Sequence, residues 1–210
     1  MTMPRIRPDI FGVLLALVLG GSGTLAAQET GTPVFKAPYR SFENWELGVS
    51  LSDPKAASYA IEGFYSFGSG PNDVGLRGGY VDQGPQGAVA LGIDFRRRII
   101  HASESFPLDG ALTAGFGTQL ASGAYDAFFV PVGISLGRRI DLENSNTSFV
   151  PYFQPIIVPT FYSGDNAPDG GVDFALGLGV DIKFGGRLDV RVSGGIGDID
   201  GVAIGLAYVH

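Results

Sequence analysis

Large apolar residues alternate with small or polar residues along most of the chain from residue 45 onward. In residues 45–51 every odd position is Trp, Leu or Val, and every even position is Glu, Gly or Ser. A period of two residues is that of a β-strand. The same period recurs in the segments 59–67, 74–80, 89–95, 112–120, 128–136, 149–162, 174–184, 188–192 and 202–208. It is least regular at 149–162, which is apolar on both faces. The pattern predicts about ten strands, with eight as the alternative.

The two faces of these predicted strands differ in the volume of their side chains as well as in polarity. Glycine is frequent on the polar face, for example at Gly75, Gly92, Gly117 and Gly177, and aromatic residues lie near strand ends on the apolar face. Small residues suit the interior of a narrow barrel, and an apolar exterior with aromatic ends suits a bilayer. We therefore predict an all-β fold, a single antiparallel up-and-down transmembrane β-barrel formed by residues 43–210. A soluble lipocalin-like barrel, with the apolar face inside, is the alternative.

The first residues follow the pattern of a secretory signal peptide. Two arginines among the first seven residues precede an apolar run at 10–19 and then a group of small residues. This order predicts a signal peptide over residues 1–27, cleaved after Ala26 or Ala27. A retained anchoring helix is the alternative, although the run is shorter than the roughly 20 residues that span a bilayer. Residues 28–42 form a polar lead segment before the barrel.

The composition and the motifs of the chain limit the ligands and reactions that we expect of it. The chain has no cysteine, which excludes disulfides and thiolate metal sites, and its net charge of −7 without a basic cluster argues against a nucleic-acid partner. Of the two histidines, His210 ends the chain and His101 lies in a predicted turn, where a solvated role is preferred over catalysis. Asp165, Asp169 and Asp173 lack the spacing of a calcium loop. We expect no enzymatic activity, no cofactor and no metal site.

The end of the chain carries a family resemblance. Residues 203–210 read Ala-Ile-Gly-Leu-Ala-Tyr-Val-His, with Tyr208 three residues after a glycine. This is similar to the barrel-assembly signal of small outer-membrane β-barrel proteins of Gram-negative envelopes, the outer membrane β-barrel domain proteins of eight to ten strands, although these usually end in phenylalanine and this chain ends in His210. The resemblance covers residues 43–210. It implies a place in the cell outer membrane and assembly by the barrel-assembly machinery through the C-terminal strand, and it implies no activity.

Charges on the predicted inward face can be paired through strand registers. If Glu62 lies opposite Arg77, a loop remains at 68–71, and if Arg77 lies opposite Asp94, a loop remains at 84–87. These registers predict a row of alternating charges across three neighbouring strands. The row is Glu62, Arg77 and Asp94.

A second charge cluster is predicted near the end of the chain. A turn at 185–187 places Lys183 opposite Asp189 and Asp181 opposite Arg191, whereas a two-residue turn would pair inward with outward side chains. Interleaved signs indicate a crosslinked, closed lumen rather than an open pore of one sign. The simplest interpretation is that these charges fill a narrow interior whose polar groups need partners.

The seventh predicted strand contains prolines at spacing four, Pro151, Pro155 and Pro159. Proline has no backbone N–H, and residues of equal parity direct that group toward the same neighbouring strand. One edge of this strand therefore lacks donors. A bend or bulge explains the prolines most simply, and a lateral seam that passes a lipid chain or an amphipathic ligand is the sharper hypothesis.

Two functions of different class agree with these patterns. The first is an integral outer-membrane barrel with a charge-paired, closed lumen and a structural or interaction role. The second is a small porin-like transport barrel that passes solute through the lumen, or lipid through the proline seam. Outer-membrane lipid and the barrel-assembly machinery are the expected partners. The sequence does not define a ligand or an oligomeric state.

Overall fold

A computed structural model describes residues 29–38, 45–55, 57–85, 87–121, 125–165 and 167–210. The predicted signal peptide and its cleavage site lie outside the described residues, as do both ends of the predicted lead segment. In the described part of the chain, no helix is long and apolar enough to cross a membrane.

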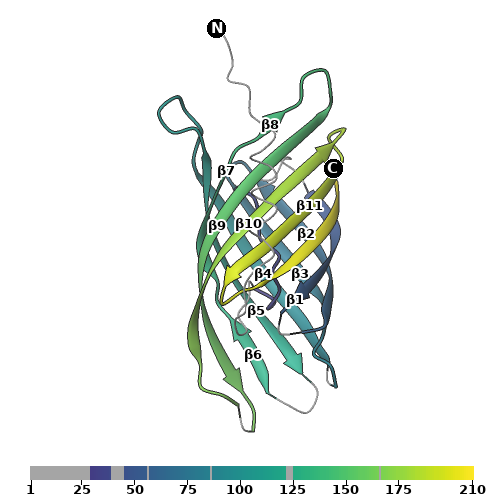
Figure 1. Cartoon of the computed structure of the whole chain (residues 1–210), viewed down its shortest axis with the longest axis vertical. Helices are drawn as coiled ribbons and strands as arrows, with labels where there is room; N and C mark the ends of the chain where they lie inside the picture. The colour runs from purple at the N-terminus through teal and green to yellow at the C-terminus, as the bar shows by residue number, and fades with distance from the viewer. Residues whose placement is uncertain (1–28, 39–44, 56, 86, 122–124, 166) are drawn as a thin grey trace.

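The described strands form one antiparallel sheet that closes on itself (Figure 1). They are β1 (Trp45–Pro54), β2 (Tyr59–Ser69), β3 (Asn72–Asp82), β4 (Gly87–Ile100), β5 (Asp109–Ala121), β6 (Asp126–Phe129), β7 (Val132–Gly137), β8 (Ile140–Asp141), β9 (Thr147–Ser163), β10 (Gly171–Phe184), β11 (Leu188–Gly197) and β12 (Gly201–Val209). Pairing of β1 with β12 closes the sheet.

One barrel strand is divided into two pieces. Both β6 and β7 pair with β5 on one side and β9 on the other, so together they form one strand that breaks at residues 130–131. The short β8 extends the pairing with β9. The barrel therefore has ten strands, which confirms the predicted fold class and the preferred strand count.

The apolar face of the strands points outward, as predicted. Leu47, Val49 and Leu51 on β1 are 55%, 57% and 51% exposed, and apolar residues at matching positions of the other strands are similarly exposed. The alternation thus produces an apolar belt that only a bilayer would cover. Trp45 stacks on His210 with ring centroids 5.2 Å apart, so the C-terminal histidine is an aromatic partner where β1 and β12 close the barrel.

Two predicted strand registers were wrong by two residues. Pairing of β2 with β3 continues to Ser69 and Asn72, so the turn is Gly70–Pro71 rather than the predicted loop 68–71. Gly70 has a φ of +57°, a conformation that glycine adopts easily and that favours a tight hairpin. The β3–β4 connection is 83–86, not 84–87. A shift of two preserves parity, so the inward side chains stay inward.

Candidate functional site: a filled lumen

Arg191 on β11 is the centre of a charge cluster in the lumen. Its Nη2 lies 2.5 Å from Oε2 of Glu46 on β1 and 2.9 Å from Oδ2 of Asp189. Asp181 on β10 is 3.8 Å from Arg191, and Lys183 lies 3.1 Å from Asp189. The register sets Asp181 opposite Arg191 and Lys183 opposite Asp189, which is the predicted pairing. The sequence prediction missed Glu46, the closest carboxylate to Arg191.

Small residues on β12 allow Arg191 to reach Glu46. Strand β12 lies between β11 and β1, and Ala203, Gly205 and Ala207 are three of its inward positions. A Cβ added to Gly205 would lie 3.7 Å from Cβ of Arg191, so the arginine lies over this strand. The charged cluster thus crosslinks strands that are not direct neighbours.

Arg77 on β3 is the centre of a second cluster. Its Nη1 lies 3.3 Å from Oε2 of Glu62 and 3.0 Å from Oγ of Ser50, and its Nε lies 3.7 Å from Oε1 of Glu29. Arg77 lies opposite Phe64, not opposite Glu62, so the ion pair is diagonal. The predicted partnership exists, but the direct opposition was wrong because the β2–β3 turn is shorter.

Asp94 on β4 does not have its predicted partner. It lies opposite Gly75 instead of Arg77, and it forms an ion pair with Lys36. Two residues further along β4, Arg96 binds Asp73 with Nε and Oδ2 2.8 Å apart. The row of three charges predicted from the sequence is therefore not formed by direct opposition. A lysine and a glutamate from outside the barrel wall, Lys36 and Glu29, connect Asp94 to Arg77.

That lysine belongs to residues 29–38, which lie inside the barrel (Figure 1) and which we call the lumen segment. Phe35, Thr32 and Glu29 are at most 3% exposed, although none of them is in a strand. The chain turns near Gly31, which has a φ of +81°, and Nζ of Lys36 returns to within 3.0 Å of Oε1 of Glu29. This segment falls within the polar lead predicted from the sequence, where no lumen role was expected.

Hydrogen bonds from five barrel strands hold the backbone of the lumen segment. Tyr152 OH donates to the Phe35 carbonyl at 2.8 Å, and Gln119 Nε2 donates to the Thr30 carbonyl at 2.9 Å. Further partners are Arg96 for the Ala37 carbonyl, Ser135 for the Lys36 carbonyl, Ser193 for the Pro33 carbonyl and Gln154 for the Lys36 N–H. Buried backbone groups need such partners, so the segment is bound to the barrel and not merely enclosed.

Inward glycines make the room that the lumen segment occupies. A Cβ added to Gly117 would lie 1.4 Å from the carbonyl oxygen of Glu29, and one added to Gly177 would lie 1.9 Å from Cδ1 of Phe35. At Gly92 the nearest atoms would be in Glu29 and Thr30, at 2.9 Å. The glycine-rich face, from which we predicted a cramped interior, is thus the surface on which the segment packs.

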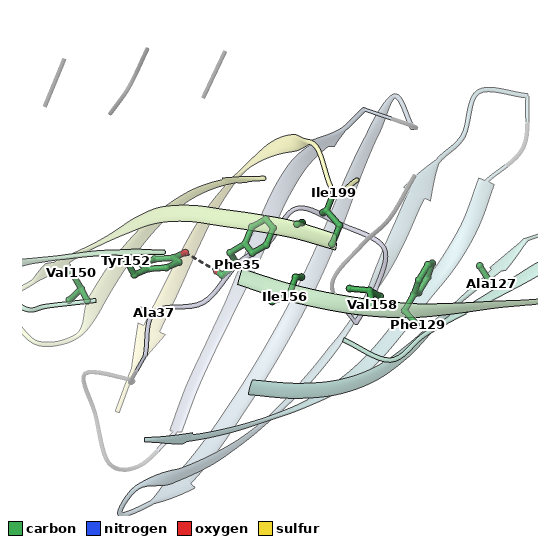
Figure 2. Packing of buried hydrophobic residues seen from close by; sticks show 10 residues of the cluster. Phe35, Ala37, Ala127, Phe129, Val150, Tyr152, Ile156, Val158 and Ile199 are labelled. Carbon is green, nitrogen blue, oxygen red and sulfur yellow. Dashed lines mark hydrogen bonds between the residues drawn. The ribbon is translucent and has the colours of Figure 1, made fainter. Parts of the chain in front are cut away.

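Besides its charged half, the lumen has an apolar half, whose buried side chains are shown in Figure 2. Strands β6, β9 and β10 supply Ala127, Phe129, Val150, Tyr152, Ile156, Val158 and Ala175 to one buried cluster, which also contains Ile199. The lumen segment adds Phe35 and Ala37 to this cluster and directs Lys36 toward Asp94 on the charged side. The lumen segment therefore places apolar side chains in the apolar half of the interior and a charged side chain in the charged half.

Little space remains between the lumen segment and the charged wall. A void of about 20 Å³ lies among residues that include Phe35, Phe64 and Arg77. This volume can hold a water molecule. Asp181 lines this void, and its buried Oδ1, which has no hydrogen-bond partner, is a suitable partner for such water.

The other predicted features lie away from the lumen. His101 is exposed in the connection between β4 and β5. The prolines of β9 direct their side chains outward at half-buried positions. Within the described residues, no group of three or more His, Cys, Asp or Glu side chains is arranged to hold a metal ion.

Comparison with known proteins identifies the fold of the chain but no family to which it belongs. No protein-family model matches the chain, and no curated protein matches its sequence. The beta domain of the Bordetella autotransporter BrkA is similar in structure, with a TM-score of 0.53 and 16% identity over 79% of this chain and 98% of that domain. A bacterial polysaccharide outer membrane secretin gives a TM-score of 0.48 and 11% identity over 82% of this chain and 67% of the other. The similarity to the autotransporter beta domain shows that the protein has the fold of an outer-membrane β-barrel.

Proposed function

We propose that this protein is an integral outer-membrane β-barrel whose lumen is closed by its own residues 29–38, and that its role is structural or in interactions made by its loops. The observation that carries the proposal is the lumen segment, which is buried and hydrogen-bonded to five strands. A polar interior that is filled in this way rigidifies a barrel and blocks a path for solute. The proposal includes no catalysis and no cofactor.

The proposed location is the outer membrane, reached after signal-peptide cleavage. Trp45 and His210 lie together at one end of the barrel, which in this proposal faces the periplasm. The C-terminal strand β12 is the proposed contact with the barrel-assembly machinery, and bilayer lipid covers the apolar belt. Nucleic acid is not a proposed partner.

A transport barrel is the second candidate. Passage of solute through the lumen would require the lumen segment to leave, and its buried contacts oppose this. Passage of a lipid chain through the wall is favoured by one observation, the interrupted pairing of β9 with β7 opposite Pro155, on a strand whose three prolines lack backbone donors.

Planar-bilayer recording tests the closed lumen. We expect purified, refolded wild-type protein to give no steady channel current. A variant in which residues 29–38 are replaced by a Gly-Ser sequence of equal length should conduct, because it lacks the side chains that fill the lumen. Steady channels of hundreds of picosiemens from wild-type protein, or a silent replacement variant that is correctly folded, would contradict the proposal.

Correct folding is checked by electrophoresis without boiling. A closed barrel has all its strand edges paired, so the folded form should stay compact in cold detergent and migrate differently after boiling. Planar-bilayer currents are recorded only from preparations that show this shift in mobility. The shift separates a variant that is folded and silent from one that is not inserted.

A further inference from the structure

The edge of β9 that faces β6 and β7 lacks hydrogen-bond donors at regular intervals. The carbonyl of Pro151 accepts from Arg138 N at 3.2 Å, and the carbonyl of Pro159 accepts from Val130 N at 3.0 Å. In an antiparallel strand the nitrogen and carbonyl of one residue face the same neighbour, so both proline nitrogens face the β6–β7 strand. Pro155 has the same parity and faces it too. Three donors are thus missing from one edge.

Pairing along this edge is interrupted where the donors are missing. Strand β7 pairs with β9 at Val132 and Gly133 and again at Leu136 and Gly137, and the gap lies opposite Pro155. The β6–β7 strand itself breaks at residues 130–131. On the other edge, β9 pairs with β10 without interruption from Thr147 to Thr160. The contact between β9 and β6–β7 is therefore the weaker of the two ladders on β9.

The lumen is apolar behind the part of this contact next to the 130–131 break, whereas the polar side chains of Gln154 and Ser135 point inward beside Pro155. Ile156 and Val158 on β9 point inward and are at most 2% exposed, and Phe129 on β6 packs in the same cluster. Outside the contact, Ile157 and Val132 are 48% and 39% exposed to the region that lipid would cover. A hydrocarbon chain that crossed the wall here would meet apolar surface on both sides, whereas elsewhere it would meet the charged half of the lumen.

Phe35 occupies the space into which such a chain would extend (Figure 2). The ring lies against Gly177 on β10 and Gly195 on β11, and it belongs to the same cluster as Ile156. Phe35 comes from the lumen segment and not from the wall, so its removal would open an apolar pocket without breaking a strand.

We propose that the apolar half of the lumen is a binding pocket for one hydrocarbon chain of a bilayer lipid, entered between β9 and the β6–β7 strand and occupied by Phe35 in the closed state. A lipid chain is the occupant because the outer face of the contact is apolar and half exposed, so hydrocarbon of the bilayer is the medium that adjoins it. The pocket goes beyond the closure of the lumen to solutes, and it rests on the proposed function only in the position of Phe35 inside the lumen.

Quenching of a single tryptophan by phospholipids brominated on their acyl chains tests the pocket. The native chain has one tryptophan, so Trp45→Phe provides a background without indole. Phe129→Trp places a reporter on the lumen side of the contact. With Phe35 present we expect weak quenching, and in Phe35→Ala we expect a marked loss of fluorescence as a chain enters. Phe35→Leu, which opens less space, should give a smaller loss and serves where Phe35→Ala folds poorly.

Two matched variants decide what an increase in quenching means. Pro151→Val, Pro155→Val and Pro159→Val together restore the missing donors and should return the quenching in Phe35→Ala to the level seen with Phe35 present. Val81→Trp places the same reporter in the separate buried cluster of β2, β3 and β4, where Phe35→Ala should change nothing. The pocket is refuted if Phe35→Ala and Phe35→Leu leave quenching at position 129 unchanged, if proline replacement does not reduce it, or if position 81 responds equally.

Conductance of the same preparations separates this inference from the proposed function. A quenching response in a non-conducting barrel supports both the lipid-chain pocket and the closed lumen. Current through wild-type protein would contradict the closed lumen while the quenching result still decides the pocket. An absent quenching response in a silent barrel would remove the pocket alone.

Discussion

Arg191→Leu is expected to lower the free energy of unfolding by about 3–5 kcal/mol, because removal of one partner leaves buried carboxylates without their cation. Glu46 and Asp189 have side chains that are 3% and 0% exposed, and the Arg191 guanidinium contacts both. Asp189 keeps Lys183, whereas Glu46 and Asp181 both lose the Arg191 guanidinium. Reversible urea unfolding of protein folded in lipid vesicles measures the difference.

Arg187→Leu is the matched control for this change. Arg187 is exposed in the turn between β10 and β11, so its loss should alter the free energy by no more than about 0.5 kcal/mol. The combined change Glu46→Gln with Arg191→Leu should cost less than Arg191→Leu alone, since one of the buried carboxylates that contact Arg191 is then neutral. Equal free energies for Arg191→Leu and Arg187→Leu would show that the cluster does not stabilise the barrel.

Gly177→Leu is expected to displace Phe35 and open the lumen to ions. The three atoms nearest to an added Cβ all belong to the Phe35 ring, at 1.9, 2.3 and 2.5 Å, so the side chain cannot be accommodated while the ring stays. Overpacking of this kind typically costs about 1–3 kcal/mol, which the movable lumen segment relieves more easily than the strands. Planar-bilayer recording should show channel current from Gly177→Leu.

Gly63→Leu tests whether any added leucine has this effect. A Cβ at Gly63 would meet no atom nearer than 3.9 Å, so this variant should remain silent. Phe35→Ala combined with Gly177→Leu should reduce the current again, because the leucine then fills the space of the ring. Current from Gly177→Leu no greater than from Gly63→Leu would mean that Phe35 does not help to seal the lumen.

The fold was predictable because one strong pattern runs through the chain. Alternation of residues such as Leu47, Gly48 and Val49 determines which side chains face lipid, and a two-residue period cannot be satisfied by a helix. The charge pairs on β10 and β11 were also predictable, since parity excluded a two-residue turn and left the turn at 185–187. Parity could not distinguish registers that differ by two, which is why Arg77 was placed opposite the wrong residues.

The lumen segment could not be predicted from local pattern. Its contacts join residues far apart in the chain, such as Gln119 with Thr30 and Tyr152 with Phe35, and no periodicity within residues 29–38 signals them. The inward glycines carried an indirect signal, because Gly117 and Gly177 leave more space than the charged side chains alone would fill. That signal indicates an occupant without identifying it.

The position of Phe35 in the membrane-embedded protein is the most direct test of a lumen closed by residues 29–38. Nuclear Overhauser effects between the Phe35 ring protons and the α-protons of Gly177, measured in lipid nanodiscs, report the contact without any substitution. We predict clear cross-peaks to Gly177 and protection of the Phe35 ring from a water-soluble relaxation agent. Absence of the cross-peaks together with strong relaxation of the ring by that agent would place the segment outside the lumen and contradict the closed barrel.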